Sequence, residues 1–194
     1  MSDYWHVSGM VEARVKILGG DTDKRWSDKS DETLSLCRSY IPFAADILDF
    51  GCGVGRMSSD ILAYRSDVHV TGYDTSPSML TMAEARISAN SLTFARFKPV
   101  SQLSPFIDYN FVIASLVFQH MNKDDLEVFF DYGCHVKEDG LLYVDNLFKR
   151  RVWNGERWID DGANVEDYLD SRFRIVKKFE AEPCHFRRLY KAKP

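Results

Sequence analysis

The chain has 194 residues, enough for one domain with a sizeable hydrophobic core. Apolar residues make up 45% and charged residues 28%, as in a soluble globular protein, and a net charge of −4 excludes an overall positive field that would attract nucleic acid or an acidic membrane. The first residues lack the apolar core of a signal peptide, and the apolar run near 111–118 is too short to cross a bilayer, so we expect a cytoplasmic protein with reduced cysteines.

Strand and helix signals alternate along the chain. We expect strands at about 45–50, 68–73, 92–97, 110–117, 141–145, 173–180 and 185–191, and helices at 56–64, 77–90, 123–137 and near 164–169. Ser76 before Pro77 is typical of a helix start, and Gly140 is expected to end the helix before it. The short link at 181–184 predicts an antiparallel hairpin. The order predicts an α/β fold with a doubly wound, mostly parallel open sheet.

The stretch from Ile47 to Arg56, ILDFGCGVGR, carries the strongest functional signal. An apolar run that suits a buried strand is followed by glycines at 51, 53 and 55, and a helix begins at Arg56. Glycine lets a backbone turn sharply and lets a ligand approach the main chain, so the pattern favours nucleotide binding. The spacing is G-x-G-x-G, not the G-x-G-x-x-G of dinucleotide sites. Asp49 would repel a pyrophosphate and suits a cationic ligand such as S-adenosylmethionine.

This stretch resembles the cofactor loop of class I S-adenosylmethionine-dependent methyltransferases, and the resemblance extends over about 45–191. It implies a seven-stranded, mostly parallel sheet whose last strand is antiparallel. It also implies that S-adenosylmethionine, with S-adenosylhomocysteine as product, binds over the carboxyl ends of the first strands. The part of the loop that the resemblance assigns to the methionine moiety consists of Asp49, Gly51, Cys52, Gly53 and Gly55.

The resemblance assigns further residues to the cofactor. Arg56 is expected to pair with the methionine carboxylate. Asp74, at the end of the second strand, matches an acidic residue that accepts hydrogen bonds from both ribose hydroxyls, and Thr75 would flank the adenine. Val100 and Ser101 match the loop that frames the adenine edge. The aspartate usual there is replaced by Pro99 or Val100 in this chain, and Ser101 or Gln102 is a candidate substitute.

The segment that follows the fourth strand is the expected acceptor side. Ser115 and Leu116 would lie under the sulfonium and methyl group. Methyl transfer is an in-line displacement, so much of the acceleration comes from alignment, and a base is needed only if the acceptor must lose a proton. His120 lies on the rim where the acceptor should enter and is a candidate base, although it also suits a loop-ordering or packing role. Asn146 is a candidate hydrogen-bonding anchor for the acceptor.

The proposed domain organisation leaves two segments to shape specificity. We expect one methyltransferase domain with an N-terminal helical cap over 1–40, a cofactor-binding core over 41–146, a substrate-side insertion over 147–170 and a terminal hairpin over 171–194. Both the cap and the insertion contain aromatic residues and few basic clusters, which suits a small organic acceptor methylated on an O or N atom. Nucleic-acid and membrane partners are not expected, and the oligomeric state is left open.

Two other functions stay open. One is methylation of a peptide N-terminus, because the chain resembles the α-N-terminal protein methyltransferases in several residue pairs at comparable places. Gln119 replaces the glycine usual in that family. The pairs here are Tyr4-Trp5, Gly55-Arg56, Gln119-His120, Asp145-Asn146 and Asp160-Asp161. The other is a methyltransferase-like binding subunit without catalysis. A metal-dependent O-methyltransferase would need a carboxylate where Ala114-Ser115-Leu116 stands, so no metal is expected. The glycine spacing disfavours a nicotinamide-dependent reductase.

Overall fold

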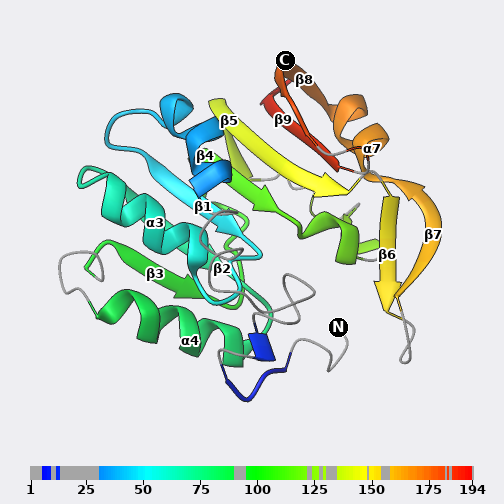
Figure 1. The fold of residues 1–194 in the computed structure, drawn as a ribbon. Helices are drawn as coiled ribbons and strands as arrows, with labels where there is room; N and C mark the ends of the chain where they lie inside the picture. Colours follow the sequence, from blue (N-terminus) through cyan, green and yellow to red (C-terminus); the bar gives the residue numbers. More distant parts are fainter. Residues whose placement is uncertain are drawn as a thin grey trace. The chain divides into compact units, whose positions relative to one another are not determined.

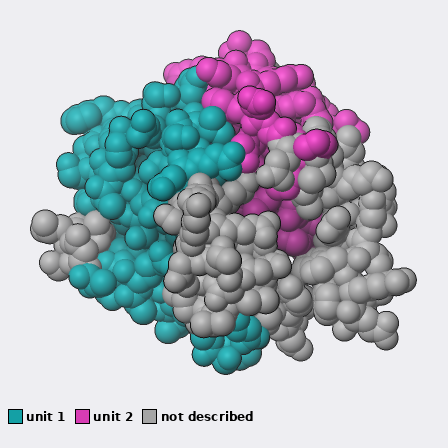
Figure 2. Space-filling model, viewed as in Figure 1, with its two compact units in different colours: residues 1–103 teal, residues 104–194 magenta. Residues whose placement is uncertain are grey.

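The computed structural model describes residues 6–9, 12–13, 31–89, 95–121, 124–126, 129, 135–147, 149–153, 158–181, 183 and 185–193. For residues 147, 149–153 and 158–164 it describes the backbone alone. The chain divides into two compact units, Met1–Leu103 and Ser104–Pro194, which are coloured separately in Figure 2. Unit 1 contributes the strands β3-β2-β1, and unit 2 the strands β4-β5-β9-β8, to a seven-stranded sheet in that order. The predicted fold class is therefore confirmed.

Unit 1 contains the parallel part of the sheet nearest the glycine loop (Figure 1). Residues 31–37 are helical, and the elements that follow are η2 (Arg38–Tyr40), β1 (Asp46–Phe50), α3 (Arg56–Tyr64), β2 (His69–Tyr73), α4 (Pro77–Ser88) and β3 (Phe97–Val100). The strand β2 pairs in parallel with both β1 and β3. Helix α3 packs on β2, α4 packs on β3, and the two helices contact each other. The carboxyl ends of β1, β2 and β3 therefore share one edge of the unit.

The third strand lies later in the chain than the sequence indicates. We expected it at 92–97, whereas β3 runs from Phe97 to Val100, with Val70 opposite Phe97 and Tyr73 opposite Val100. Pro99 lies within this strand, opposite Gly72. Proline lacks an N–H, but β3 is the last strand at its edge of the sheet, where that missing donor is tolerated. The proline made the strand hard to recognise from sequence.

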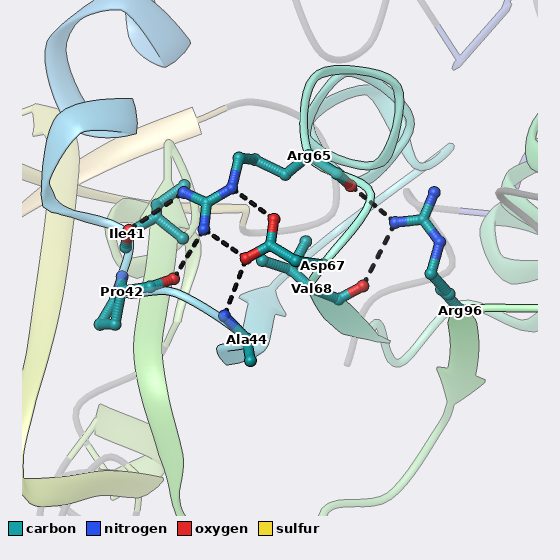
Figure 3. Close-up of polar contacts among 7 residues, drawn as sticks. All are labelled: Ile41, Pro42, Ala44, Arg65, Asp67, Val68 and Arg96. Atoms are coloured by element: carbon teal, nitrogen blue, oxygen red, sulfur yellow. Dashed lines mark hydrogen bonds and ion pairs between the residues drawn. The ribbon is translucent and has the colours of Figure 1, made fainter.

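A network of arginine and aspartate side chains ties the starts of these strands together (Figure 3). Arg65 donates to the carbonyls of Ile41 and Pro42, and its guanidinium pairs with Asp67, whose carboxylate also accepts from the Ala44 N–H. Arg96 donates to the carbonyls of Arg65, Val68 and Leu62 at 2.6, 3.3 and 3.0 Å. The network lies at the edge opposite the carboxyl ends, so we assign it to stability.

Unit 2 holds the rest of the sheet and a separate ribbon (Figure 1). Its elements are β4 (Tyr109–Ser115), η3 (Phe118–His120), β5 (Val136–Leu147), β6 (Lys149–Trp153), β7 (Trp158–Asn164), α7 (Val165–Arg172), β8 (Phe173–Phe179) and β9 (His185–Ala192). The strands β4 and β5 are parallel, and β9 pairs antiparallel with both β5 and β8. The predicted terminal hairpin and the helix near 164–169 are therefore confirmed.

The fifth strand begins earlier than expected. We expected Gly140 to end a helix over 123–137, but β5 starts at Val136 and contains Gly140. The pairing shifts register between Tyr109 opposite Val136 and Phe111 opposite Leu141. A Cβ atom on Gly140 would lie 2.9 Å from the Tyr109 carbonyl oxygen, so the glycine allows the shifted strand to pass close to β4. It is a close-packing residue of the strand and does not terminate a helix.

The ribbon formed by β6 and β7 was not predicted. These strands pair antiparallel, with Trp153 opposite Trp158, and β6 packs against η3. The segment 147–170 is rich in charged residues and lacks a regular apolar period, so it gave no strand signal. Among the residues that the structure describes, no helix is both long and apolar enough to span a bilayer.

Candidate functional site

The glycine loop between β1 and α3 depends on backbone angles that favour glycine. The φ angles of Gly51, Gly53 and Gly55 are +70°, +53° and +70°, in the left-handed region where a Cβ atom is strained. The Cys52 N–H donates to the Tyr73 carbonyl at 2.8 Å, and the Gly55 N–H donates to the Cys52 carbonyl at 2.9 Å. All three glycines are therefore required by the turn, and the loop is fastened to the end of β2.

Gly55 has a second, structural reason to be glycine. It is the N-cap of α3, and a Cβ atom on it would lie 2.9 Å from Cβ of Ala83 and 3.3 Å from Cδ1 of Ile87. Its missing side chain therefore lets the start of α3 approach α4. The sequence suggested a glycine for close ligand approach, and the structure shows that this one also serves helix packing.

Asp49 is buried at the carboxyl end of β1, where one carboxylate oxygen holds the first turn of α3. Its Oδ2 accepts from the Ser58 N–H at 3.1 Å and from the Ser58 hydroxyl at 2.7 Å. Burial raises the pKa of Asp49 to about 6, although the bonds from Ser58 and the charge of Arg56 oppose the rise. The pKa of Asp49 thus lies close to neutral pH, and a bound cation would favour the charged form of the carboxylate.

Asp74 follows β2 and joins the glycine loop to helix α4. Its Oδ2 accepts from the Gly53 N–H at 2.9 Å, and its Oδ1 accepts from the Ser76 N–H at 2.8 Å. Burial raises the pKa of Asp74, and these backbone donors oppose the rise. A carboxylate has about four acceptor positions, so two such bonds leave capacity for further donors such as ribose hydroxyls. Ser76 caps α4 as predicted, since its hydroxyl accepts from the Met79 N–H.

The other predicted cofactor residues of unit 1 lie at the same strand ends. Val100 ends β3, and its carbonyl accepts from the Asp74 N–H at 3.3 Å. Thr75 and Ser101 are exposed, and Cys52 is buried with a pKa raised by burial. Arg56 is only 7% exposed, with Nη1 3.7 Å from the Met57 sulfur. Unit 1 therefore brings together all its predicted residues, with Arg56 more enclosed than a surface helix residue.

In unit 2, the end of β4 makes an unusual turn. Leu116 has a φ of +57°, which is strained for a side chain of this kind, and its N–H donates to the Asp145 carbonyl at 2.7 Å. The neighbouring Ser115 hydroxyl is buried, and the described residues provide no hydrogen-bond partner for it. Strained backbone and unsatisfied buried polar atoms gather at functional sites more often than elsewhere.

His120 and Asn146 lie on adjoining parts of this edge. The Asn146 side chain is fully buried, and its Oδ1 accepts from the Gln119 N–H at 3.4 Å. The Gln119 amide nitrogen lies 3.1 Å from Nε2 of His120. Because an amide nitrogen only donates, this contact corresponds to an imidazole whose Nε2 accepts and whose proton is on Nδ1. Asn146 thus holds the loop that carries His120.

Sequence reasoning did not find the partners of Asp145. This carboxylate is fully buried, with Oδ2 3.3 Å from Nε of Arg187 and Oδ1 3.6 Å from Nδ1 of His185. Asp145 and Arg187 are opposite each other in the antiparallel pairing of β5 and β9. Asp145 therefore belongs to a buried ion pair within the sheet. No local sequence pattern signals a pair formed by residues so far apart in the chain.

Comparisons with known proteins agree with this geometry. Residues 48–142 match the family model described as "Methyltransferase domain". Solved structures with the same fold include a protein from Pyrococcus horikoshii (TM-score 0.70, 18% identity, 93% of this chain and 96% of that one). They also include an S-adenosylmethionine-dependent methyltransferase from Clostridium acetobutylicum (TM-score 0.67, 19% identity, 93% and 96%). Residues 48–142 thus match a methyltransferase domain, and the seven-stranded sheet is the fold of solved S-adenosylmethionine-dependent methyltransferases. Both findings agree with the family predicted from the glycine loop.

A curated relative adds sequence similarity over part of its length. The malonyl-[acyl-carrier protein] O-methyltransferase of Acetivibrio thermocellus is 31% identical over 141 residues, which are 69% of this chain and 46% of that protein. The chain thus spans less than half the length of the curated relatives it matches first. The acceptor named for that relative is a property of that protein.

Some predicted features of this methyltransferase domain lie outside the described residues. These are Tyr4-Trp5 and most of the 1–40 cap, and the side chains of Asp160 and Asp161 in β7. Within the described part of the chain, no three His, Cys, Asp or Glu residues form a group able to hold a metal ion.

Proposed function

We propose that this methyltransferase domain binds S-adenosylmethionine and transfers its methyl group to an O or N atom of a small organic acceptor. The observation that carries the proposal is the pair of carboxylates beside the glycine loop. Burial raises the pKa of both Asp49 and Asp74, and the charge of Asp74 adds a smaller rise to that of Asp49. Such a site favours a ligand with positive charge and disfavours a pyrophosphate.

The roles proposed for unit 1 follow from this charge. Asp49 faces the ammonium group of the cofactor, while its Oδ2 keeps α3 in place through Ser58. Asp74 accepts the ribose hydroxyls, while Gly53 and Ser76 fix its two oxygens. Arg56 balances the methionine carboxylate. The adenine is flanked by Thr75, Val100 and Ser101, of which Ser101 is the candidate replacement for the aspartate usual in the family.

For unit 2 we propose that the segment after β4 serves methyl transfer. When bound, the cofactor supplies an electrophilic methyl group on its sulfonium. The Ser115 hydroxyl, buried and without a partner among the described residues, is suited to contact a reacting or neighbouring polar atom. The strained turn at Leu116 gives this segment a defined shape. Asn146 acts through the Gln119 N–H and so positions the loop instead of anchoring the acceptor directly.

His120 is the candidate base if the acceptor must lose a proton. For Nε2 to accept that proton, the contact with the Gln119 amide must first be released, because the lone pair of Nε2 already faces that donor. An acceptor whose O–H or N–H donates to Nε2 of His120 would take the place of the Gln119 amide. This arrangement restricts the base function to acceptors that reach the loop 118–120.

The relatives support an oxygen acceptor without naming one for this chain. The curated relative is an O-methyltransferase by name, and it is about twice the length of the matched region. The α-N-terminal alternative stays open; of the pairs on which it rests, Asp145 forms a buried ion pair with Arg187. A binding subunit without catalysis remains the competing hypothesis, and an assay of turnover separates the two.

The test is S-adenosylhomocysteine release from S-adenosylmethionine in a screen of small alcohols, carboxylic acids, phenols and amines. We expect turnover with at least one oxygen or nitrogen acceptor, and its loss in Asp74→Ala, which removes the proposed ribose ligand. His120→Ala should lower turnover roughly 10²–10⁴-fold if it is the base, with cofactor affinity unchanged. Cofactor binding without turnover on any acceptor class would favour the binding subunit.

A further inference from the structure

The described N-terminal residues pack on the glycine loop of unit 1. Val7 is 3% exposed and Ala13 is fully buried, and both belong to one apolar cluster with Val54 and Met79. Val54 lies between Gly53 and Gly55 in the loop, and Met79 lies in the first turn of α4. Figure 1 shows the blue N-terminal segment beside this end of α4. The segment thus contacts both elements that Asp74 joins.

Hydrogen bonds of Ser78 and Ser76 connect this segment to Asp74. The Val7 N–H donates to the Ser78 hydroxyl at 3.2 Å, and the hydroxyls of Ser78 and Ser76 are 3.0 Å apart. The Ser76 N–H then donates to Asp74, whose other oxygen accepts from the Gly53 N–H. The Ser78 hydroxyl thus contacts both the N-terminal segment and Ser76.

The N-terminal segment has local order of its own. Both the N–H and the hydroxyl of Ser8 donate to Oε2 of Glu12, at 2.9 and 2.8 Å, and the Ala13 N–H donates to the Gly9 carbonyl at 3.0 Å. These bonds join Ser8 and Gly9 to Glu12 and Ala13, so the buried Val7 and Ala13 belong to one locally bonded segment.

We propose that Ser78 is a positioning residue that couples docking of the N-terminal segment to cofactor binding at Asp74. The proposal rests on the proposed function. Ribose hydroxyls bound to Asp74 restrain a carboxylate that already holds the Gly53 loop and the start of α4. Restraining these two elements stabilises the surface on which Val7 and Ala13 pack. By linkage, a docked segment then strengthens cofactor binding by the same factor.

The experiment measures hydrogen exchange of residues 6–13 and S-adenosylhomocysteine affinity in the parent protein and three variants. Ser78→Ala removes the connecting hydroxyl and Ser78→Thr keeps it. Ser88→Ala is the matched control, because the exposed Ser88 hydroxyl donates to the Ala85 carbonyl in the last turn of the same helix. We expect ligand to slow exchange of the segment in the parent, and Ser78→Ala to weaken binding about 2–10-fold, the worth of one neutral hydrogen bond.

Ser78→Thr and Ser88→Ala should retain parental affinity and protection, which excludes general unfolding as the cause. If the ligand binds but leaves exchange of residues 6–13 unchanged, and Ser78→Ala binds as tightly as the parent, the coupling is wrong while the proposed function stands. If the ligand does not bind the parent at all, the proposed function fails and the coupling fails with it. Thermal melting of each variant shows that the compared proteins are folded.

Discussion

Replacing Asp49 with asparagine should make the free protein more stable at neutral pH while weakening its cofactor binding. An asparagine oxygen in place of Oδ2 still accepts both bonds from Ser58, so the local geometry is kept and only the titrating charge is removed. Burial raises the pKa of Asp49 from an ordinary 3.8 to about 6 in the folded protein. The native state therefore binds more protons than the unfolded state between these two values, and the parent loses stability as the pH rises through this window.

The size of this effect follows from the two pKa values. The rise corresponds to about 3 kcal/mol at 1.36 kcal/mol per pH unit, of which about 2 kcal/mol develops between pH 4.5 and pH 7.5. The assay is urea unfolding of parent and Asp49→Asn across this range. The difference in free energy of unfolding should shift by about 2 kcal/mol in favour of the variant as the pH rises. Parallel pH profiles for the two proteins would refute a raised pKa at Asp49.

Two further substitutions, one in each unit, test the structural arguments. Gly55→Ala should lower the free energy of unfolding by about 2–5 kcal/mol, because it combines a left-handed φ with a Cβ atom 2.9 Å from Ala83. The control is Gly9→Ala, whose added Cβ atom would have no other atom within 4 Å, so thermal melting should show no loss of stability for this variant. Arg187→Ala should cost about 3–5 kcal/mol in chemical unfolding, because it removes the arginine cation that pairs with the fully buried Asp145 charge. Lys191→Ala, which removes an exposed ion pair from the same strand, is its control, and equal losses in both would contradict the buried-pair argument.

The parts of the fold that the sequence predicted well are those with local causes. Helix α3 was predicted with its observed bounds, because the glycine loop defines its start and the apolar period defines its length. The start of α4 was predicted from Ser76 and Pro77, whose capping chemistry is contained within four residues. The grouping of Asp49 and Asp74 followed from their places at the carboxyl ends of two parallel strands.

The parts that were missed depend on contacts between distant segments. The start of β5 and the role of Gly140 are decided by how closely the strand passes Tyr109, which no local pattern contains. No alternating apolar pattern in the sequence indicates the strands of the β6 and β7 ribbon. The ion pair of Asp145 and Arg187 depends on the register of β5 against β9, which joins residues 42 positions apart in the chain.

The central claim is that the carboxylates beside the glycine loop select a cationic sulfur cofactor over a dinucleotide. Isothermal titration calorimetry of the full chain with S-adenosylmethionine, S-adenosylhomocysteine and NAD tests it most directly. We predict one site per chain for each sulfur compound, with affinity for S-adenosylmethionine increasing as the pH rises through about 6 and Asp49 ionises, and no binding of NAD. Binding of NAD together with no binding of either sulfur compound would contradict the account.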